Sequence, residues 1–183
     1  MNIDKTELKG VYLIKPTKHE DHRGFFSETY NQSKMGPLKN IHFVQDNQSL
    51  SKDKYVFRGL HFQKPPFAQG KLVRVLKGSI LDIVVDIRKS SSTFGKHKIF
   101  ELNEKDWSQI YVPEGFAHGF LTLVENTEVL YKVTNYYSPK DDLGISVMDP
   151  DLDLNLPVSK EKIIFSEKDT KQPSLKNSSY YFD

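Results

Sequence analysis

Apolar and polar residues alternate with a period of two along most of the chain. Runs rich in Val, Ile, Phe and Tyr are separated by turn signals such as Lys77-Gly78-Ser79 and Glu125-Asn126-Thr127. This pattern is typical of strands, and helix-period apolar patterns are almost missing before residue 140. We therefore predict strands over residues 41–49, 55–63, 70–77, 79–88, 96–102, 109–112, 116–124 and 127–136.

The two ends of the chain differ from this central part. A short apolar run at 11–14 precedes Asp21-His22-Arg23-Gly24, which predicts a turn into a strand over 25–30 and hence a hairpin. Residues 31–40 predict a loop or at most one helical turn, and the last forty residues predict turns with one or two short helical pieces. These elements favour an antiparallel sandwich or barrel, and 183 residues fit a single domain over 1–183.

Strand alternation predicts which side chains share a wall of such a barrel. In residues 56–63, strict alternation puts Arg58 and His61 into opposite rows: Phe57, Gly59, His61 and Gln63 against Arg58, Leu60 and Phe62. Two arrangements would still let both act on one ligand. Either a bulge at Gly59 re-aims one of them, or Arg58 acts from the other side or the end of the strand.

Three more polar residues, Lys71, His118 and Tyr131, each alternate with apolar neighbours. An apolar row with one ionisable group is what the inner wall of a barrel shows when it holds a ligand, because burying such a group without a partner costs several kcal/mol. The alternative is a structural role in which each finds a backbone or carboxylate partner. Taken singly, His118 favours the structural role, whereas Lys71 and Tyr131 fit both.

Composition excludes several classes of protein. Lys and Arg number 26 against 24 Asp and Glu, so the net charge of +2 gives no field to recruit nucleic acid or an anionic membrane. The absence of cysteine excludes disulfides, thiolate metal sites and a cysteine nucleophile. The first seven residues lack the apolar core of a signal peptide, and the longest apolar runs are broken by Asp82, Asp86 or Thr122. We expect a soluble, cytoplasmic protein.

One motif indicates whether the chain could bind a metal. Pro113-x-Gly115-x-x-His118 matches the second half of a cupin signature in which the histidine can ligate a metal. The first half requires two histidines one residue apart and a nearby carboxylate. The corresponding place reads His61-Phe62-Gln63, with no second histidine in the following thirty residues. Because a zinc or iron site needs three convergent ligands, we predict a cupin without a metal.

A series of ordered blocks resembles the RmlC-type dTDP-4-dehydrorhamnose 3,5-epimerases, a family of metal-free cupins. The resemblance implies an all-β, cupin-type jelly-roll sandwich or barrel with a few short helical segments, mainly near the C-terminus, and no cofactor. The matching blocks are Asp21-x-Arg23-Gly24-x-Phe26, Gln45-Asp46-Asn47, Arg58 to Gln63, Gln69 to Arg74, Val85 to Arg88, Val112 to Phe120, Tyr131-Lys132, Tyr136 to Pro139 and Ser166 to Asp169.

By this resemblance, His61 is the general base and Asp169 is the carboxylate that orients it. An imidazole titrates near neutral pH, and a hydrogen-bonded carboxylate fixes its tautomer. Lys71 corresponds to the residue that stabilises the enolate, and Tyr131 to the donor that returns the proton from the opposite face. The implied substrate is a nucleotide-linked 4-keto-6-deoxy sugar that is inverted at C3 and C5.

The resemblance also implies a set of substrate-binding residues and a homodimer. In the family the first hairpin is exchanged between subunits, so Arg23 and Glu28 would serve the partner's site. Arg23 and Arg58 would meet the diphosphate, because a guanidinium matches paired oxygens, and Tyr137 would stack on the thymine or shape the sugar site. The remaining expected substrate contacts are Gln45, Asp46, Asn47, His118 and Lys168.

Two departures from the family pattern affect these expectations. The family often carries tryptophans where this chain has Val147 and Asn155-Leu156, which predicts a changed pocket rim and puts the sugar specificity in question. Asp141 and Asp142 both compete for the acidic position after Tyr137.

Three other functions stay open. The first is a relative that inverts only C3 or moves the ketone between C3 and C4, although Tyr131 favours the double epimerase. The second is a catalytically silent sugar-nucleotide-binding cupin, which the joint presence of His61, Lys71, Tyr131 and Asp169 disfavours. The last is a metal-dependent cupin oxygenase.

Overall fold

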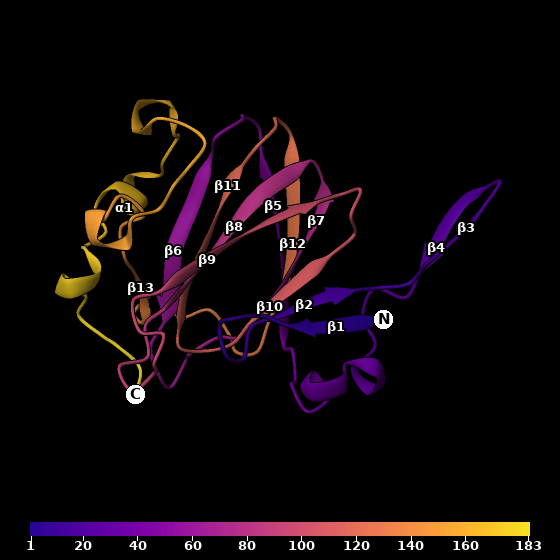
Figure 1. The fold of residues 1–183 in the computed structure, drawn as a ribbon, viewed down its shortest axis with the longest axis horizontal. Helices are drawn as coiled ribbons and strands as arrows, with labels where there is room; N and C mark the ends of the chain where they lie inside the picture. Colours follow the sequence, from indigo (N-terminus) through magenta and orange to yellow (C-terminus); the bar gives the residue numbers. More distant parts are fainter.

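The computed structural model describes every residue from Met1 to Asp183 and consists mainly of two antiparallel sheets that face each other (Figure 1). The sheet strands are β1 (Asn2–Lys5), β2 (Tyr12–Lys15), β5 (Gln45–Ser51), β6 (Phe57–Gln63), β7 (Lys71–Lys77), β8 (Ser79–Asp86), β9 (His97–Asn103), β10 (Gln109–Val112), β11 (Phe116–Thr122), β12 (Thr127–Val133) and β13 (Asp142–Gly144). One sheet has the order β1-β2-β10-β7-β12-β5 and the other the order β13-β6-β11-β8-β9.

The all-β class and the eight strands predicted after residue 40 are confirmed, with shifted ends. β12 ends at Val133 rather than at 136, because the next carbonyls, of Asn135 and Tyr136, accept hydrogen bonds from the side chains of Gln69 and Gln63 instead of from a strand. β1 and β13 were not predicted, because both are short and each has only one apolar residue.

The predicted turn and its hairpin are confirmed, as β3 (Lys18–Asp21) paired with β4 (Gly24–Ser27), but the second strand ends at Ser27 rather than at 30 and the apolar run at 11–14 lies in β2 of the six-stranded sheet. The hairpin belongs to neither large sheet and projects from the body of the molecule (Figure 1). Residues 31–40 contain two 3-10 turns, η1 (Gln32–Lys34) and η2 (Gly36–Leu38), where one at most was predicted.

The last forty residues wrap the five-stranded sheet, at the left side of the view (Figure 1). They contain four short helical pieces rather than one or two: η3 (Pro150–Leu152), η4 (Lys160–Lys162), α1 (Glu167–Thr170) and η5 (Leu175–Asn177). None of these is long enough or apolar enough to pass through a lipid bilayer.

The apolar residues form three clusters: one between the two sheets and one on the outer face of each sheet. The inner cluster contains Val73, Val75, Phe116, Phe120 and Val129, as alternation predicted. A second cluster lies on the outer face of the five-stranded sheet under the C-terminal segment, and a third covers the outer face of the six-stranded sheet beside η1 and η2. Layered packing of this kind leaves the space between the sheets for any ligand.

The expected effect of the missing tryptophans is wrong. Val147 is buried in the outer cluster with Ile145 and Leu152, on the opposite face of the five-stranded sheet from the inner cluster. Leu156 packs against the same outer cluster, and Asn155 is exposed. These substitutions therefore change how the C-terminal segment packs on the sheet, and not the rim of a pocket between the sheets.

Candidate active site

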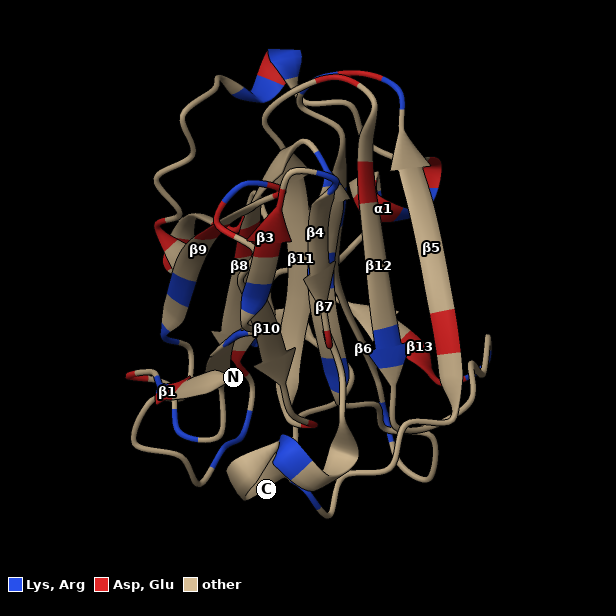
Figure 2. Cartoon of the chain, turned by 90° about the vertical axis from the view of Figure 1, so that its right-hand side faces the viewer, with Lys and Arg blue, Asp and Glu red and all other residues tan.

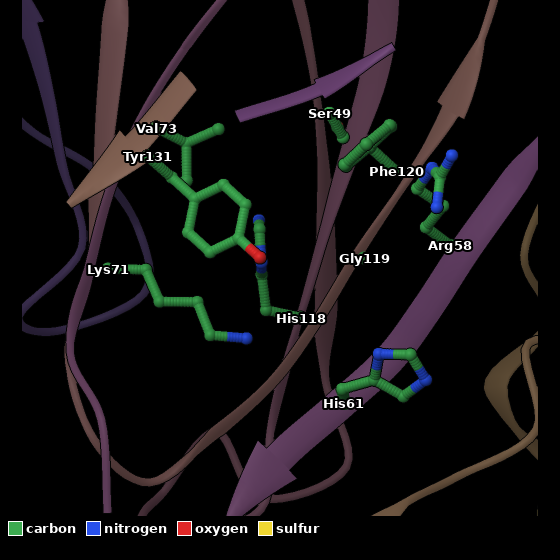
Figure 3. Close-up of a pocket in the computed structure, with 9 residues that line it drawn as sticks. All are labelled: Ser49, Arg58, His61, Lys71, Val73, His118, Gly119, Phe120 and Tyr131. Atoms are coloured by element: carbon green, nitrogen blue, oxygen red, sulfur yellow. The ribbon is translucent and has the colours of Figure 1, made fainter. Parts of the chain in front are cut away.

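Two adjoining cavities, of about 260 and 320 Å³, lie between the sheets and share His61, Lys71 and Tyr131 in their walls. Lys71 and Tyr131 enter from β7 and β12 of one sheet, whereas His61 enters from β6 of the other (Figure 3). Since the same three side chains line both spaces, the cavities form one site with reactive groups on two facing walls.

A bulge in β6 brings Arg58 and His61 to the same wall. The register between β6 and β11 shifts between His118 and Phe120, and Gly59 has φ of +138°, which only glycine adopts readily. A Cβ at Gly59 would lie 2.5 Å from Gly119 Cα, so a larger residue does not fit. The bulge alternative is therefore confirmed, and the strictly alternating rows are wrong.

The outward side of β6 shows the same effect of the bulge. Phe57, Leu60 and Phe62 all pack in the cluster on the outer face of the five-stranded sheet, although strict alternation separates Phe57 from the other two. Arg58 and His61 both line the inner cavity as a result (Figure 3).

His61 forms a tight pair with Asp169 at the edge of the cavity. Its Nε2 lies 2.6 Å from Asp169 Oδ1, so Nδ1 is the ring nitrogen that is left for a ligand. Burial favours the neutral form of Asp169, but hydrogen bonds from His61 and Ser166 outweigh it and hold the pKa of this carboxyl below its ordinary value. A charged carboxylate behind a half-buried imidazole suits a general base.

Asp169 reaches His61 because α1 lies against β6. The side chain of Ser166 caps α1 and accepts a hydrogen bond from the Asp169 backbone N–H at 3.1 Å. Only one turn of helix is therefore needed to hold a residue that is 108 positions from its partner in the chain.

Lys71 and Tyr131 face His61 with opposite electrostatic properties. Burial lowers the pKa of Lys71, although Asp142 and Asp82 act against this by stabilising the ammonium. Burial raises the pKa of Tyr131, and nearby Arg58 only partly offsets it. The tyrosine therefore keeps its proton at neutral pH and can donate it, while the lysine can place positive charge beside a developing oxyanion.

His118 lies directly opposite His61 in the β6–β11 pairing and also lines the cavity. Its Nε2 lies 3.0 and 2.9 Å from the two carboxylate oxygens of Asp82, and both residues are buried. Each histidine is thus paired with one carboxylate. No group of three or more His, Cys, Asp or Glu side chains is arranged to hold a metal ion.

Arg58 closes the gap between β6 and β5 at one end of the cavity. Its Nε donates to Ser51 Oγ at 3.2 Å and its Nη2 to the Leu50 carbonyl at 3.3 Å. The guanidinium keeps further donors for an anionic group in the cavity that it lines.

The three adjacent residues Gln45, Asp46 and Asn47 do not act together. Gln45 and Asn47 line the second cavity and bind each other at 2.8 Å. Asp46 points to the other face of β5, where Lys132 Nζ lies 2.9 Å from its carboxylate. Figure 2 shows an acidic band on β5 beside a basic band on β12. The structure does not bring Asp46 into the cavity.

Tyr137 and Lys168 meet at Asp142, a residue that the sequence did not single out. The Tyr137 hydroxyl and Lys168 Nζ donate to the same oxygen of Asp142, at 3.0 and 2.5 Å, and Asp142 lines the second cavity. Asp141 instead accepts a hydrogen bond from Ser138 Oγ at 2.6 Å. The structure therefore selects Asp142 as the acidic residue of the site, a choice between two neighbours that spacing alone does not make.

Arg23 and Glu28 lie outside the cavity. Arg23 is exposed in the hairpin turn, where its Nη2 lies 2.7 Å from Asp21 Oδ2, and Glu28 forms a 2.9 Å ion pair with Lys34. Phe26, on the same hairpin, is 71% exposed. Within one chain, the structure brings the hairpin residues to none of the reactive groups.

The chain is similar to known proteins over almost its whole length. The family model described as dTDP-4-dehydrorhamnose 3,5-epimerase matches residues 5–177. Proteins of that name from Sinorhizobium fredii and Shigella flexneri are 44% and 42% identical, over 96% and 99% of this chain and 90% and 99% of their own.

Solved structures of proteins with this activity in their names also match. The dTDP-4-dehydrorhamnose 3,5-epimerase of Elizabethkingia anophelis superposes with a TM-score of 0.92 at 43% identity, over 98% of this chain and 99% of its own. The dTDP-6-deoxy-D-glucose-3,5-epimerase RmlC of Legionella pneumophila, in complex with dTDP-4-keto-L-rhamnose, has a TM-score of 0.90 at 38% identity, over 96% of this chain and 93% of its own.

The fold and the site together define a cupin-like enzyme with acid–base groups on two facing sheets. The chain belongs to the dTDP-4-dehydrorhamnose 3,5-epimerase family.

Proposed function

We propose that this protein is a dTDP-4-dehydrorhamnose 3,5-epimerase, which inverts C3 and C5 of dTDP-4-dehydro-6-deoxy-D-glucose to give dTDP-4-dehydro-L-rhamnose. One observation carries the proposal: the His61–Asp169 pair on one wall of the cavity faces Tyr131 and Lys71 on the other. Family membership and the likeness to a relative in complex with dTDP-4-keto-L-rhamnose support the same substrate.

The proposed reaction begins with His61, which takes the proton from the carbon beside the C4 ketone. The electron pair of the broken C–H bond moves into an enolate, and the charge on its oxygen is stabilised by the Lys71 ammonium. Tyr131 then gives its proton to the same carbon from the opposite face and inverts it. Before the second cycle, His61 releases the proton it took to solvent and Tyr131 regains a proton from solvent. The same steps at the other carbon beside the ketone then complete the reaction, with no net gain or loss of protons or electrons.

The proposed substrate contacts follow from the residues around the cavity. Arg58 is assigned to the diphosphate and Tyr137 to the nucleotide or sugar. Asp46 is assigned to its surface ion pair with Lys132 rather than to the substrate. The other proposed contacts are Gln45, Asn47, His118, Asp142 and Lys168.

We also propose that two copies of the chain exchange their N-terminal hairpins in a homodimer, so that Arg23 and Glu28 complete the partner's site. The position of Arg23 outside its own cavity and the exposure of Phe26 support this assembly. A cytoplasmic location and a single domain over residues 1–183 stay predictions from the sequence.

Mixed variants test the hairpin exchange. Arg23→Ala and His61→Ala subunits, each with low activity alone, are unfolded, mixed and refolded so that hybrid dimers form. If hairpins are exchanged, each hybrid has one site with both His61 and the partner's Arg23, so mixing restores activity. No gain over the separate variants would contradict the exchange.

The identity of the product tests the proposed reaction. Purified protein is incubated with dTDP-4-dehydro-6-deoxy-D-glucose, and the proton couplings of the product sugar are measured by NMR. Inversion at both C3 and C5 supports the proposal. Inversion at C3 alone or a ketone moved to C3 supports the narrower relatives, and binding without change supports a silent sugar-nucleotide-binding protein.

A further inference from the structure

One polar side chain in the cavity wall has no partner within the protein. The residues of β5 that face inward form an entirely polar row of Gln45, Asn47, Ser49 and Ser51. Gln45 and Asn47 bind each other, and Ser51 Oγ accepts a hydrogen bond from Arg58. Ser49 Oγ is shielded from solvent and has no hydrogen-bond partner.

Ser49 lies between the reactive groups and the guanidinium of Arg58. In the pairing of β5 with β12, Asn47 is opposite Tyr131 and Ser49 is opposite Val129, two residues further toward Ser51. Ser49 also lines the first cavity together with His61, Tyr131 and Arg58 (Figure 3). Its side chain is therefore placed where a ligand that spans from Tyr131 to Arg58 would pass.

A buried hydroxyl without a hydrogen bond destabilises the folded state. Leaving such a group without a hydrogen bond costs about 1–3 kcal/mol, so a serine at this place is retained at the expense of stability. No side chain of the cavity that it lines, polar or apolar, forms a hydrogen bond with it. A partner for Ser49 must come from what enters the cavity.

We propose that Ser49 is a further substrate-binding residue, whose side chain turns toward the cavity when ligand binds, so that its hydroxyl forms a hydrogen bond with an oxygen at the junction of sugar and diphosphate in the bound nucleotide sugar. The inference rests on the proposed function, because it is the position between Tyr131 and Arg58 that selects this part of the substrate. The oxygen belongs either to the sugar or to the phosphate next to it, and both present the same acceptor chemistry.

A matched pair of serine variants tests the inference. Ser79 is the second buried serine whose Oγ has no partner, and it lines a separate surface cavity with Glu101 and Asn103. Ser49→Ala and Ser79→Ala therefore remove the same kind of group from inside and outside the site. Thermal unfolding and calorimetric affinities for dTDP and for the dTDP-linked substrate are measured for both variants and for the natural chain, with the affinity for the substrate taken in the inactive His61→Ala background.

We expect Ser49→Ala to keep or slightly raise the melting temperature, because the hydroxyl has no partner to lose, and to weaken substrate binding about tenfold. Weaker binding of both ligands indicates a phosphate oxygen, and weaker binding of the sugar-linked ligand alone indicates a sugar oxygen. Ser79→Ala should change neither affinity.

Unchanged affinity of Ser49→Ala for both ligands overturns the inference, as does a lower melting temperature with normal binding, which would indicate a structural role. If the natural chain itself does not bind or convert the dTDP-linked sugar, the proposed function fails and takes this inference with it. Normal turnover by the natural chain with normal binding by Ser49→Ala overturns the inference alone.

Discussion

Two histidine–carboxylate pairs lie side by side on neighbouring strands, and they differ in what they leave free. His61 and His118 are directly opposite in the β6–β11 pairing, and each uses Nε2 to bind a buried carboxylate. The side chain of His61 is 28% exposed and that of His118 is 7% exposed. The same two residue types thus form one pair that is open to a ligand and one that is nearly closed.

The carboxylates of the two pairs also come from different parts of the fold. Asp82 lies on β8, beside β11 in the same sheet, whereas Asp169 comes from α1 in the C-terminal segment that wraps the sheet. We infer that the His118–Asp82 pair belongs to the packing of the sheet and holds the cavity wall. In the other pair, only His61 belongs to the sheet, and Asp169 reaches it from α1 outside the sheet. This pair is therefore not part of the packing between strands, which suits a catalytic role.

The largest expected difference between the pairs is in turnover. His61→Ala removes the proposed base and should lower kcat by about 10³-fold, within the range of about 10²–10⁴ that general bases contribute. Binding of dTDP, measured by calorimetry, should stay unchanged because the base contacts the reacting carbon. Turnover close to that of the natural chain would show that another group takes the proton.

Asp169→Asn should have the next largest effect on turnover, a loss of about 10²-fold in kcat, because an amide neither fixes the same tautomer nor stabilises the charged imidazole. Steady-state kinetics with Asp169→Glu as the conservative variant check this. A role in folding alone would lower the melting temperature of Asp169→Asn and leave kcat per folded molecule unchanged.

His118→Ala should reverse the balance between activity and stability. It leaves the carboxylate of Asp82 buried without a partner, so we expect the free energy of unfolding to fall by about 3–5 kcal/mol. Turnover of the folded fraction should fall only about tenfold, through a lost contact in the cavity wall. Urea unfolding and kinetics on the same samples separate the two effects, and a loss of turnover as large as that of His61→Ala would contradict the comparison.

The smallest expected effect is on the pH dependence of stability. The folded-state pKa of Asp169 lies below its ordinary value, since hydrogen bonds from His61 and Ser166 outweigh burial. Its stabilising contribution is therefore fully present above the ordinary carboxyl pKa and is lost as pH falls through the lowered folded value. The stability difference between the natural chain and Asp169→Asn, from urea unfolding at several pH values, should shrink on acidification. A difference that grows instead would show that the pKa is raised.

The sequence predicts which residues line the cavity between the sheets better than it predicts the two histidine–carboxylate pairs. Period-two alternation correctly placed Lys71, His118 and Tyr131 among inward-facing apolar residues, because strands impose that period. It separated Arg58 from His61, since one extra residue at a bulge reverses the alternation, and the glycine there only indicates that a bulge is possible.

Other features depend on contacts that no local pattern records. Asp169 meets His61 through the docking of α1 on β6, which only the family resemblance indicated. Asp142 and Asp141 are neighbours that meet different partners, and Ser49 looks like any other strand serine. The role of such a residue depends on a hydrogen bond to a distant part of the chain, or on a hydroxyl that lacks a partner. It can therefore be recognised only in the folded structure.

The central claim is that His61 removes a proton on one wall of the cavity and Tyr131 returns one from the other. Deuterium entry at C3 and C5 of the dTDP-linked sugar in heavy water, followed by NMR in the natural chain, His61→Ala and Tyr131→Phe, tests it most directly. The account predicts label with inversion in the natural chain, no label in His61→Ala, and label with retained configuration in Tyr131→Phe, since the base can return deuterium to the face it attacked. Full labelling by His61→Ala would contradict the account.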